Sequence, residues 1–178
     1  QMLAQAEFCP SQIGTIKFTV TWTLDELGLD AFEPGDVVIH NDPYRGSGHV
    51  PEHMVLKPVF FEGELFGFVA NVAHMSEPGA KTPGGLSGDA TEVFQEGLLL
   101  PPVKIRKRGV DDNDIWKIIL ANHRTPKVTY GDFRAMMASL DLAEERLHEL
   151  LATYGADLVR RSCQELITIS ERRMRAEI

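Results

Sequence analysis

The sequence has little cysteine and no long hydrophobic run. Its 178 residues include only two cysteines, Cys9 and Cys163, which lie far apart and outside any CxxC pattern, so neither a disulfide framework nor a thiolate zinc site is indicated. The longest apolar runs, such as 65–70, fall far short of the roughly 20 residues that a membrane-spanning helix needs, and no signal-peptide pattern is present. We therefore expect a cytoplasmic protein that has no membrane partner.

Positive charge is also scarce. The net charge of -8 and the pI near 5.2 argue against general binding to phosphate backbones, so we expect no nucleic-acid partner. With 43% hydrophobic and 25% charged residues, the composition is that of a globular chain with one real core. Because the chain begins at Gln1 within apparent structure and ends inside a helical pattern, we expect a fragment of a larger subunit.

The patterning predicts a mixed α/β fold. Residues 15–27 fit both an alternating strand and one face of a helix, and residues 36–40 form a short apolar strand that leads into a glycine-containing loop. Two further apolar runs, 53–61 and 65–74, flank Glu62-Gly63 and predict a β-hairpin. Residues 76–89 are rich in Gly, Pro and Ser and predict a long loop.

The last third of the chain is predicted to be helical. An acidic first turn at 111–114 begins an apolar helix that Pro126 must end. Asp132 is the expected N-cap of a longer amphipathic helix that Gly155 stops, and a second helix follows. We thus expect residues 1–131 to form a metal-site region with loops and the hairpin. Residues 132–178 would form a helical hairpin of the same domain.

Two histidines and one carboxylate carry the main chemical signal. If the hairpin turns at Glu62-Gly63, each residue pairs with the one whose number brings the sum to about 126. This pairing sets His74 opposite position 52 and near His49. Two imidazoles and the Glu52 carboxylate, with positions left open, would suit divalent Mn, Fe or Zn. The alternative is that these are ordinary polar groups of a surface loop.

Three further features are candidates for the same chemistry. Asp42 lies close enough in the loop to be a fourth ligand or to orient an imidazole. Glu92 would be a general base near the metal, or simply part of an acidic helix start. Gly84 and Gly85 belong to a loop whose backbone N–H groups could bind a phosphate or substrate anion, although it matches neither Walker A nor GxGxxG.

Five ordered blocks of the sequence carry a resemblance to a known family: GDVVIHNDPYRGSGHVPE, PVFFEGELFGFVANVAH, TPGGLSGDATEVFQEGLLLPPVKI, LANHRTP and GDFRAMMASL. They resemble the hydantoinase B/oxoprolinase family, which includes subunits of N-methylhydantoinase, acetone and acetophenone carboxylase, and caprolactamase. The resemblance implies that residues 15–27 are helical and that His49, Glu52 and His74 hold a divalent metal. It departs at Glu52, where many relatives have Asp.

The resemblance also implies an activity. Such a subunit would work with a hydantoinase A-type partner that binds ATP, in a hetero-oligomer that opens a cyclic amide such as a lactam or hydantoin through a phosphorylated intermediate. ATP-dependent ketone carboxylation is the alternative on the same scaffold, and Glu52 together with the segment HMSEPG favours that branch. A non-catalytic fragment that acts as an interaction module is a third interpretation, and on its own the fragment would be inactive.

Overall fold

A long antiparallel hairpin forms where the sequence predicts it. The computed structural model describes residues 2–5 and 9–178. Strands β2 (Glu52–Phe61) and β3 (Glu64–His74) are joined by Glu62 and Gly63, whose φ angles of 53° and 85° fit a two-residue turn of the hairpin type. The predicted pairing holds from Glu52 opposite His74 onward, and the register shifts by one residue only between Val59 and Phe60.

The hairpin is one end of a five-stranded antiparallel sheet. The other strands are β1 (Val37–His40), β4 (Val103–Lys107) and β5 (Val110–Asp111), and the order across the sheet is β3-β2-β1-β4-β5. Strand β3 therefore lies at the edge and, within residues 2–5 and 9–178, pairs only with β2. The last residue of this edge strand is His74.

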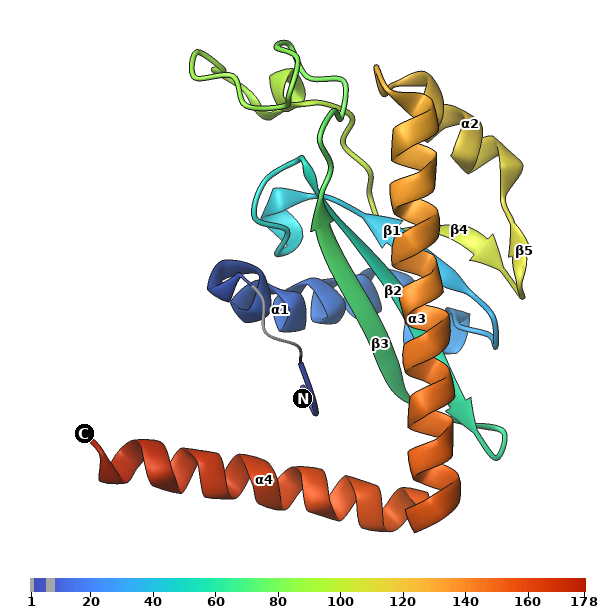
Figure 1. The fold of residues 1–178 in the computed structure, drawn as a ribbon, viewed down its shortest axis with the longest axis vertical. Helices are drawn as coiled ribbons and strands as arrows, with labels where there is room; N and C mark the ends of the chain where they lie inside the picture. The colour runs from blue at the N-terminus through green and yellow to red at the C-terminus, as the bar shows by residue number, and fades with distance from the viewer. Residues whose placement is uncertain (1, 6–8) are drawn as a thin grey trace.

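Helices cover both faces of the sheet because its strands alternate two apolar sets (Figure 1). Helix α1 (Pro10–Leu27) packs on one face, against a cluster of Phe32, Val38, Met54 and Leu56. Helices α2 (Asn113–Ala121) and α3 (Pro126–Tyr154) pack on the other. The buried residues of that second cluster are Val37, Ile39, Val55, Met75, Leu100, Ile105, Trp116, Ile119, Phe133, Met136, Met137 and Leu140.

Helix α1 settles the ambiguity of residues 15–27 in favour of a helix. Ile16, Val20, Leu24 and Leu27 point toward the sheet, as the helical pattern requires. The hydroxyls of buried threonines on this helix donate to backbone carbonyls four residues earlier, so their burial leaves no hydroxyl unpaired. The expectation of a helix is confirmed, and the helix starts earlier, at Pro10.

The C-terminal helices differ from the expected boundaries. Asp112 caps α2 by accepting hydrogen bonds from two backbone N–H groups, but α3 begins at Pro126 and not at Asp132. Helix α2 already ends at Ala121, before Pro126, and Pro126 instead begins α3, because a proline in the first helical turn loses no hydrogen bond. Three short 3-10 helices, Leu29–Ala31, Pro43–Arg45 and Val93–Glu96, lie in the connections.

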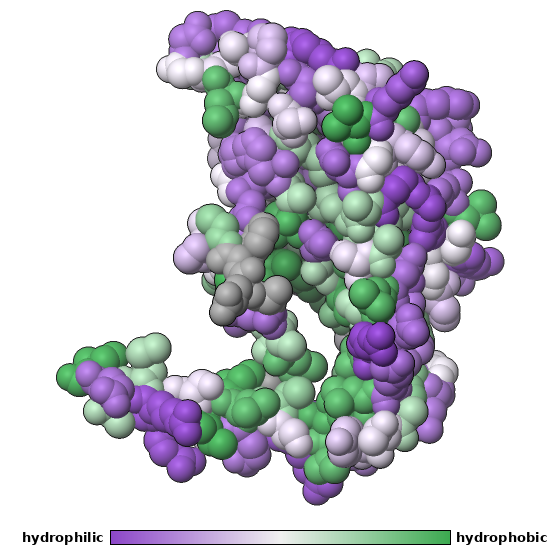
Figure 2. Space-filling view, in the orientation of Figure 1, coloured by the Kyte–Doolittle hydropathy of each residue, from purple (hydrophilic) through white to green (hydrophobic). Residues whose placement is uncertain are grey.

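Helix α4 (Ala156–Ala176) follows α3 across Gly155, whose φ is 77°. The two helices meet at an elbow and diverge, instead of lying side by side as the expected helical hairpin would (Figure 1). Hydrophobic side chains gather over α4 and the adjoining end of α3 (Figure 2). Leu158 and Leu166 of α4 are exposed. No helix in the described part of the chain is long and apolar enough to cross a membrane.

Two histidines, His40 and His53, have no exposed surface, and they predict a stability that depends on pH. Burial lowers the pKa of His40 to about 4 and that of His53 to about 3. In the unfolded chain both take up protons below about pH 6.5, whereas the folded chain resists until those lower values, so the unfolded state binds more protons and stability falls with falling pH. We expect the free energy of unfolding to drop by the order of 3 kcal/mol per histidine between pH 7 and pH 4.

Urea unfolding at several pH values measures this slope. His40 offers the matched variant, because neither ring nitrogen has a hydrogen-bond partner in the described structure. His40→Leu removes one of the two titrating groups, so its stability should decline less steeply. An equal slope in the variant and the parent chain would show that His40 does not contribute.

Candidate functional site

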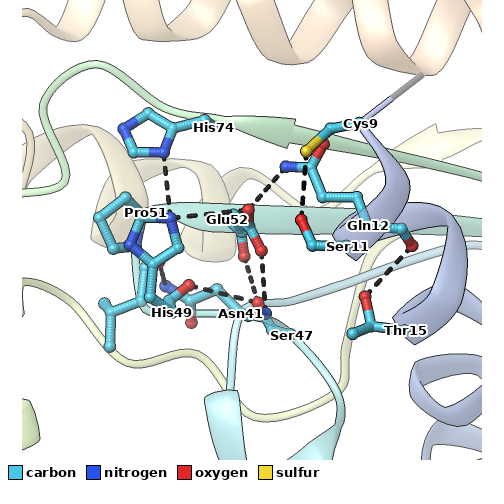
Figure 3. A network of polar contacts seen from close by, with 12 residues as sticks. Cys9, Ser11, Gln12, Thr15, Asn41, Ser47, His49, Pro51, Glu52 and His74 are labelled. Atoms are coloured by element: carbon cyan, nitrogen blue, oxygen red, sulfur yellow. Dashed lines mark hydrogen bonds and ion pairs between the residues drawn. The ribbon is translucent and has the colours of Figure 1, made fainter.

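The register of the hairpin brings Glu52 and His74 together. The backbone N–H of Met75 donates to the carbonyl of Pro51, which makes Glu52 and His74 the neighbouring pair that exchanges no backbone hydrogen bonds. Side chains approach most closely at such pairs. His49 completes the group: its Nε2 lies 3.1 Å from Nδ1 of His74 and 3.6 Å from Oε1 of Glu52 (Figure 3).

The Glu52 carboxylate is held from two sides. Gln12, in the first turn of α1, donates from Nε2 to Oε1 at 2.7 Å, and the backbone N–H of Gly48 donates to Oε2 at 2.9 Å (Figure 3). The side chain of Gln12 is buried, and Glu52 itself is only 8% exposed. A Cβ on Gly48 would lie 2.3 Å from Oε2, so this close approach requires glycine.

Two residues that the sequence did not single out support the loop beneath the cluster. The hydroxyl of Ser47 donates to the carbonyl of Glu52 at 2.7 Å. Asn41, fully buried, donates to the carbonyls of Val50 and Leu98 and accepts from the backbone N–H of Leu100. A buried amide that satisfies three backbone groups fixes the loop relative to the segment that follows the long glycine-rich loop.

The electrostatics favour the neutral imidazole of His74. Desolvation and the adjacent His49 ring lower the pKa of His74, while Glu52 opposes the shift. Neutral nitrogen lone pairs are the form in which histidine binds a metal ion. His74 therefore presents a neutral imidazole beside the side chains of His49 and Glu52.

The spacing of these donor atoms fits one ion, although their present orientation does not. Among residues 2–5 and 9–178, no group of three or more His, Cys, Asp or Glu is already arranged to hold a metal ion. The reason is that the nitrogens of His49 and His74 face each other in a hydrogen bond. Ligand atoms around one ion at about 2.1 Å stand about 3.0 to 3.4 Å apart, close to the separations seen here, so reorientation of the imidazole rings would complete the site.

Asp42 serves a different purpose in the structure. Its Oδ1 accepts from the backbone N–H of Tyr44, and its Oδ2 pairs with Arg45 at 2.6 Å. Arg45 also pairs with Glu26 on α1. The carboxylate thus caps a 3-10 helix and ties the loop to α1, and its side-chain contacts link it to none of the three residues of the cluster in the described chain.

The glycine-rich loop binds a carboxylate of its own chain. The N–H groups of Gly84 and Gly79 donate to the two oxygens of Glu77, which also pairs with Arg124. Burial opposes the charge of Glu77, but these donors outweigh it and lower its pKa. The N–H of Gly85 donates to the Thr82 carbonyl. The Gly84 and Gly85 donors of the loop are therefore engaged within the chain itself.

Glu92 is exposed and precedes the 3-10 helix at 93–96, where only its backbone carbonyl accepts a hydrogen bond. The acidic helix start expected around Glu92 is therefore just one short turn. The structure does not bring Glu92 into contact with His49, Glu52 or His74 among the described residues.

The fold is a mixed α/β scaffold with a cluster of two histidines and one glutamate at the end of its edge strand, and comparison with known proteins gives its family. The family model described as Hydantoinase B/oxoprolinase matches residues 1–178. The chain belongs to the hydantoinase B/oxoprolinase family.

Three relatives illustrate its range. The chain is 37% identical over 150 residues to a protein of Pseudomonas sp. (strain NS671) named provisionally as a D-/L-hydantoinase subunit, covering 84% of this chain and 25% of that one. It is similar to the crystal structure of ATP-dependent caprolactamase from Pseudomonas jessenii, with a TM-score of 0.93 and 34% identity over 98% of this chain and 30% of the other. It is 32% identical to the acetophenone carboxylase delta subunit of Aromatoleum aromaticum, over 85% of this chain and 22% of that protein.

The chain thus spans about a quarter to a third of the length of three curated relatives that it matches. The expected family and the mixed α/β fold with a hairpin and C-terminal helices are confirmed. The metal ligands, the Asp42 and Glu92 roles and the glycine-loop anion site stay predictions.

Proposed function

We propose that this chain forms the cation-binding part of a subunit of an ATP-dependent enzyme that opens the C–N bond of a cyclic amide, a lactam or a hydantoin. The observation that carries the proposal is the His49, Glu52 and His74 cluster, set by the hairpin register at the end of the edge strand. Similarity to a caprolactamase and to a provisionally named hydantoinase supports this reaction class.

In this proposal the two imidazoles and the Glu52 carboxylate hold a divalent Mn, Fe or Zn ion. Such an ion supplies Lewis-acid polarisation of an oxygen on the substrate. The chain's own residues prepare the site: Gln12 and the Gly48 N–H fix the orientation of the carboxylate, and their bonds leave its charge available toward His49. Holding the carboxylate in advance reduces the reorganisation needed when the ligand binds.

ATP would be bound by a hydantoinase A-type partner. The sequence contains neither a Walker A motif nor GxGxxG, and three of the relatives carry the names of single components of multi-component enzymes. We therefore propose a hetero-oligomer in the cytoplasm, where ATP is available. The partner would phosphorylate the amide-derived oxygen, and this subunit would position the activated compound for attack by water.

Ketone carboxylation is the second candidate, because the acetophenone carboxylase delta subunit is also similar to this chain. One experiment separates the two. The full-length subunit, purified with its ATP-binding partner, is assayed for ATP hydrolysis stimulated by hydantoins, by lactams, and by ketones with bicarbonate. Stimulation by a cyclic amide, with release of the ring-opened product, is expected; stimulation only by ketone with bicarbonate would overturn the proposal in favour of the carboxylase.

A further inference from the structure

A hollow of about 590 Å³ lies beside His74, along the free edge of β3. Gln12 of α1 borders it on one side and Ala135 and Met136 of α3 on the other, with β3 residues from Asn71 to Met75 between them. This volume is within the range of small-molecule sites, and its mixture of apolar walls and a few polar groups is typical of them. The contacts among His49, Glu52 and His74 described above leave this hollow open.

The backbone of β3 is a hydrogen-bonding surface of this hollow. Because Met75 donates to Pro51, the backbone groups of Ala73 and Met75 face β2, and those of Val72 and His74 face the opposite way, toward the free edge. In an extended residue the N–H and C=O lie side by side and point in the same direction. Val72 thus presents one donor and one acceptor to the hollow, and no other strand in the described chain pairs with them.

A cyclic amide matches this pair of groups. In a small lactam or hydantoin ring the amide is cis, so its N–H and C=O also lie side by side and can donate and accept at once. An open-chain secondary amide is trans and turns these two groups in opposite directions, so it can satisfy only one of the two backbone groups of Val72. The edge can therefore distinguish a ring from an opened chain.

We propose that the hollow binds the substrate ring, with its cis amide on the backbone of Val72 and its methylene groups against Ala135 and Met136. This inference rests on the proposed function and adds the place and the mode of recognition. The ring then lies next to His74, because residue 72 is two positions from it on the same strand and both side chains line the hollow. Asn71, whose amide donates to Ser139, contributes a polar wall.

The test uses ε-caprolactam as the probe and two independent variants of the full-length subunit in its complex. Val72→Pro removes the outward N–H without touching a bond to β2, and proline is tolerated at such edge positions. Ala135→Phe fills the hollow from α3, where the position is exposed. Ala138→Phe is the matched control, since Ala138 is exposed on the same helix and does not line the hollow.

We expect both variants to raise the KM for ε-caprolactam at least about tenfold while the bound cation content stays the same, because lost hydrogen bonds and overpacking each cost roughly that much. Ala138→Phe should behave as the parent enzyme. N-methyl-ε-caprolactam, which lacks the amide donor, should bind the parent about tenfold more weakly by calorimetry, and Val72→Pro should keep this discrimination, because proline retains the carbonyl that accepts from the lactam N–H.

The outcomes distinguish a failure of the proposed function from a failure of the pocket assignment. If the parent complex opens no cyclic amide, the proposed function is wrong. If it opens ε-caprolactam and Ala135→Phe leaves the KM unchanged, the function stands and the pocket assignment is wrong. Should Val72→Pro fail to fold, Ala135→Phe and the N-methyl probe still decide. A complex in which another strand pairs with β3 would bind both probes equally, which also overturns the assignment.

Discussion

Replacement of His74 by alanine is expected to weaken binding of a divalent cation at least about 100-fold and to reduce ATP-coupled turnover in parallel. The side chain supplies one of only two imidazoles in the cluster, at 3.1 Å from the other. Removal leaves one imidazole and one carboxylate, too few to hold a Mn, Fe or Zn ion against water. Elemental analysis of the purified protein and titration with Mn²⁺ or Zn²⁺ measure the first effect.

His148→Ala is the matched control for this prediction. His148 lies on α3, and its Nε2 interacts with the carbonyl of Phe60, near the far end of the hairpin from the cluster. Its loss should leave cation content and turnover unchanged. His49→Ala should repeat the behaviour of His74→Ala. Full cation content and full turnover in both cluster variants would refute the assignment of these histidines as ligands.

The second large effect is expected from a substitution of Gly48. Gly48→Ala would set a Cβ at 2.3 Å from Oε2 of Glu52, far inside contact distance, and the carboxylate or the loop must move. Glu52 would then lose the hydrogen bond from the Gly48 N–H and its alignment with His49. We expect cation affinity to fall by about 10- to 100-fold, the usual effect of disturbing a group that orients a ligand.

Gly14→Ala is the control for this change. Gly14 lies in α1, and an added Cβ would meet nothing within 4 Å. Alanine there should stabilise the chain by up to about 1 kcal/mol and leave cation affinity unchanged. Titration of both variants, with thermal unfolding in parallel, separates a change at the site from a change in stability. Equal affinity in Gly48→Ala and the parent chain would mean that Glu52 is not a ligand.

The local part of the site could be predicted from the sequence. A two-residue turn fixes which residues of a hairpin face each other, so the Glu62-Gly63 turn alone specified that Glu52 lies opposite His74. The apolar stripe of α3 was equally readable, because a helix buries residues at a fixed spacing. Where the spacing fitted both a strand and a helix, at 15–27, only packing against the sheet decided.

The long-range part could not be predicted. Gln12 reaches Glu52 from 40 residues away, across a contact that exists only once α1 lies on the sheet. The same holds for the glycine loop: its N–H groups were expected to bind an anion, and the tertiary approach of Glu77 supplies that anion from the chain itself. Neither Gln12 nor Glu77 is marked by a periodic pattern in the sequence, because a hydrogen bond requires contact between only two atoms.

The hydrogen bond between Gln12 and Glu52 also connects helix α1 to the β2–β3 hairpin, and these two elements unfold locally in different ways. A hairpin can fray locally, whereas α1 leaves the sheet only by exposing its apolar face. An ion held by Glu52 would link these two openings, because undocking α1 would release the carboxylate from Gln12. Amide hydrogens along α1 would then exchange more slowly when the ion is present. Hydrogen exchange of this helix would therefore measure whether the ion is bound.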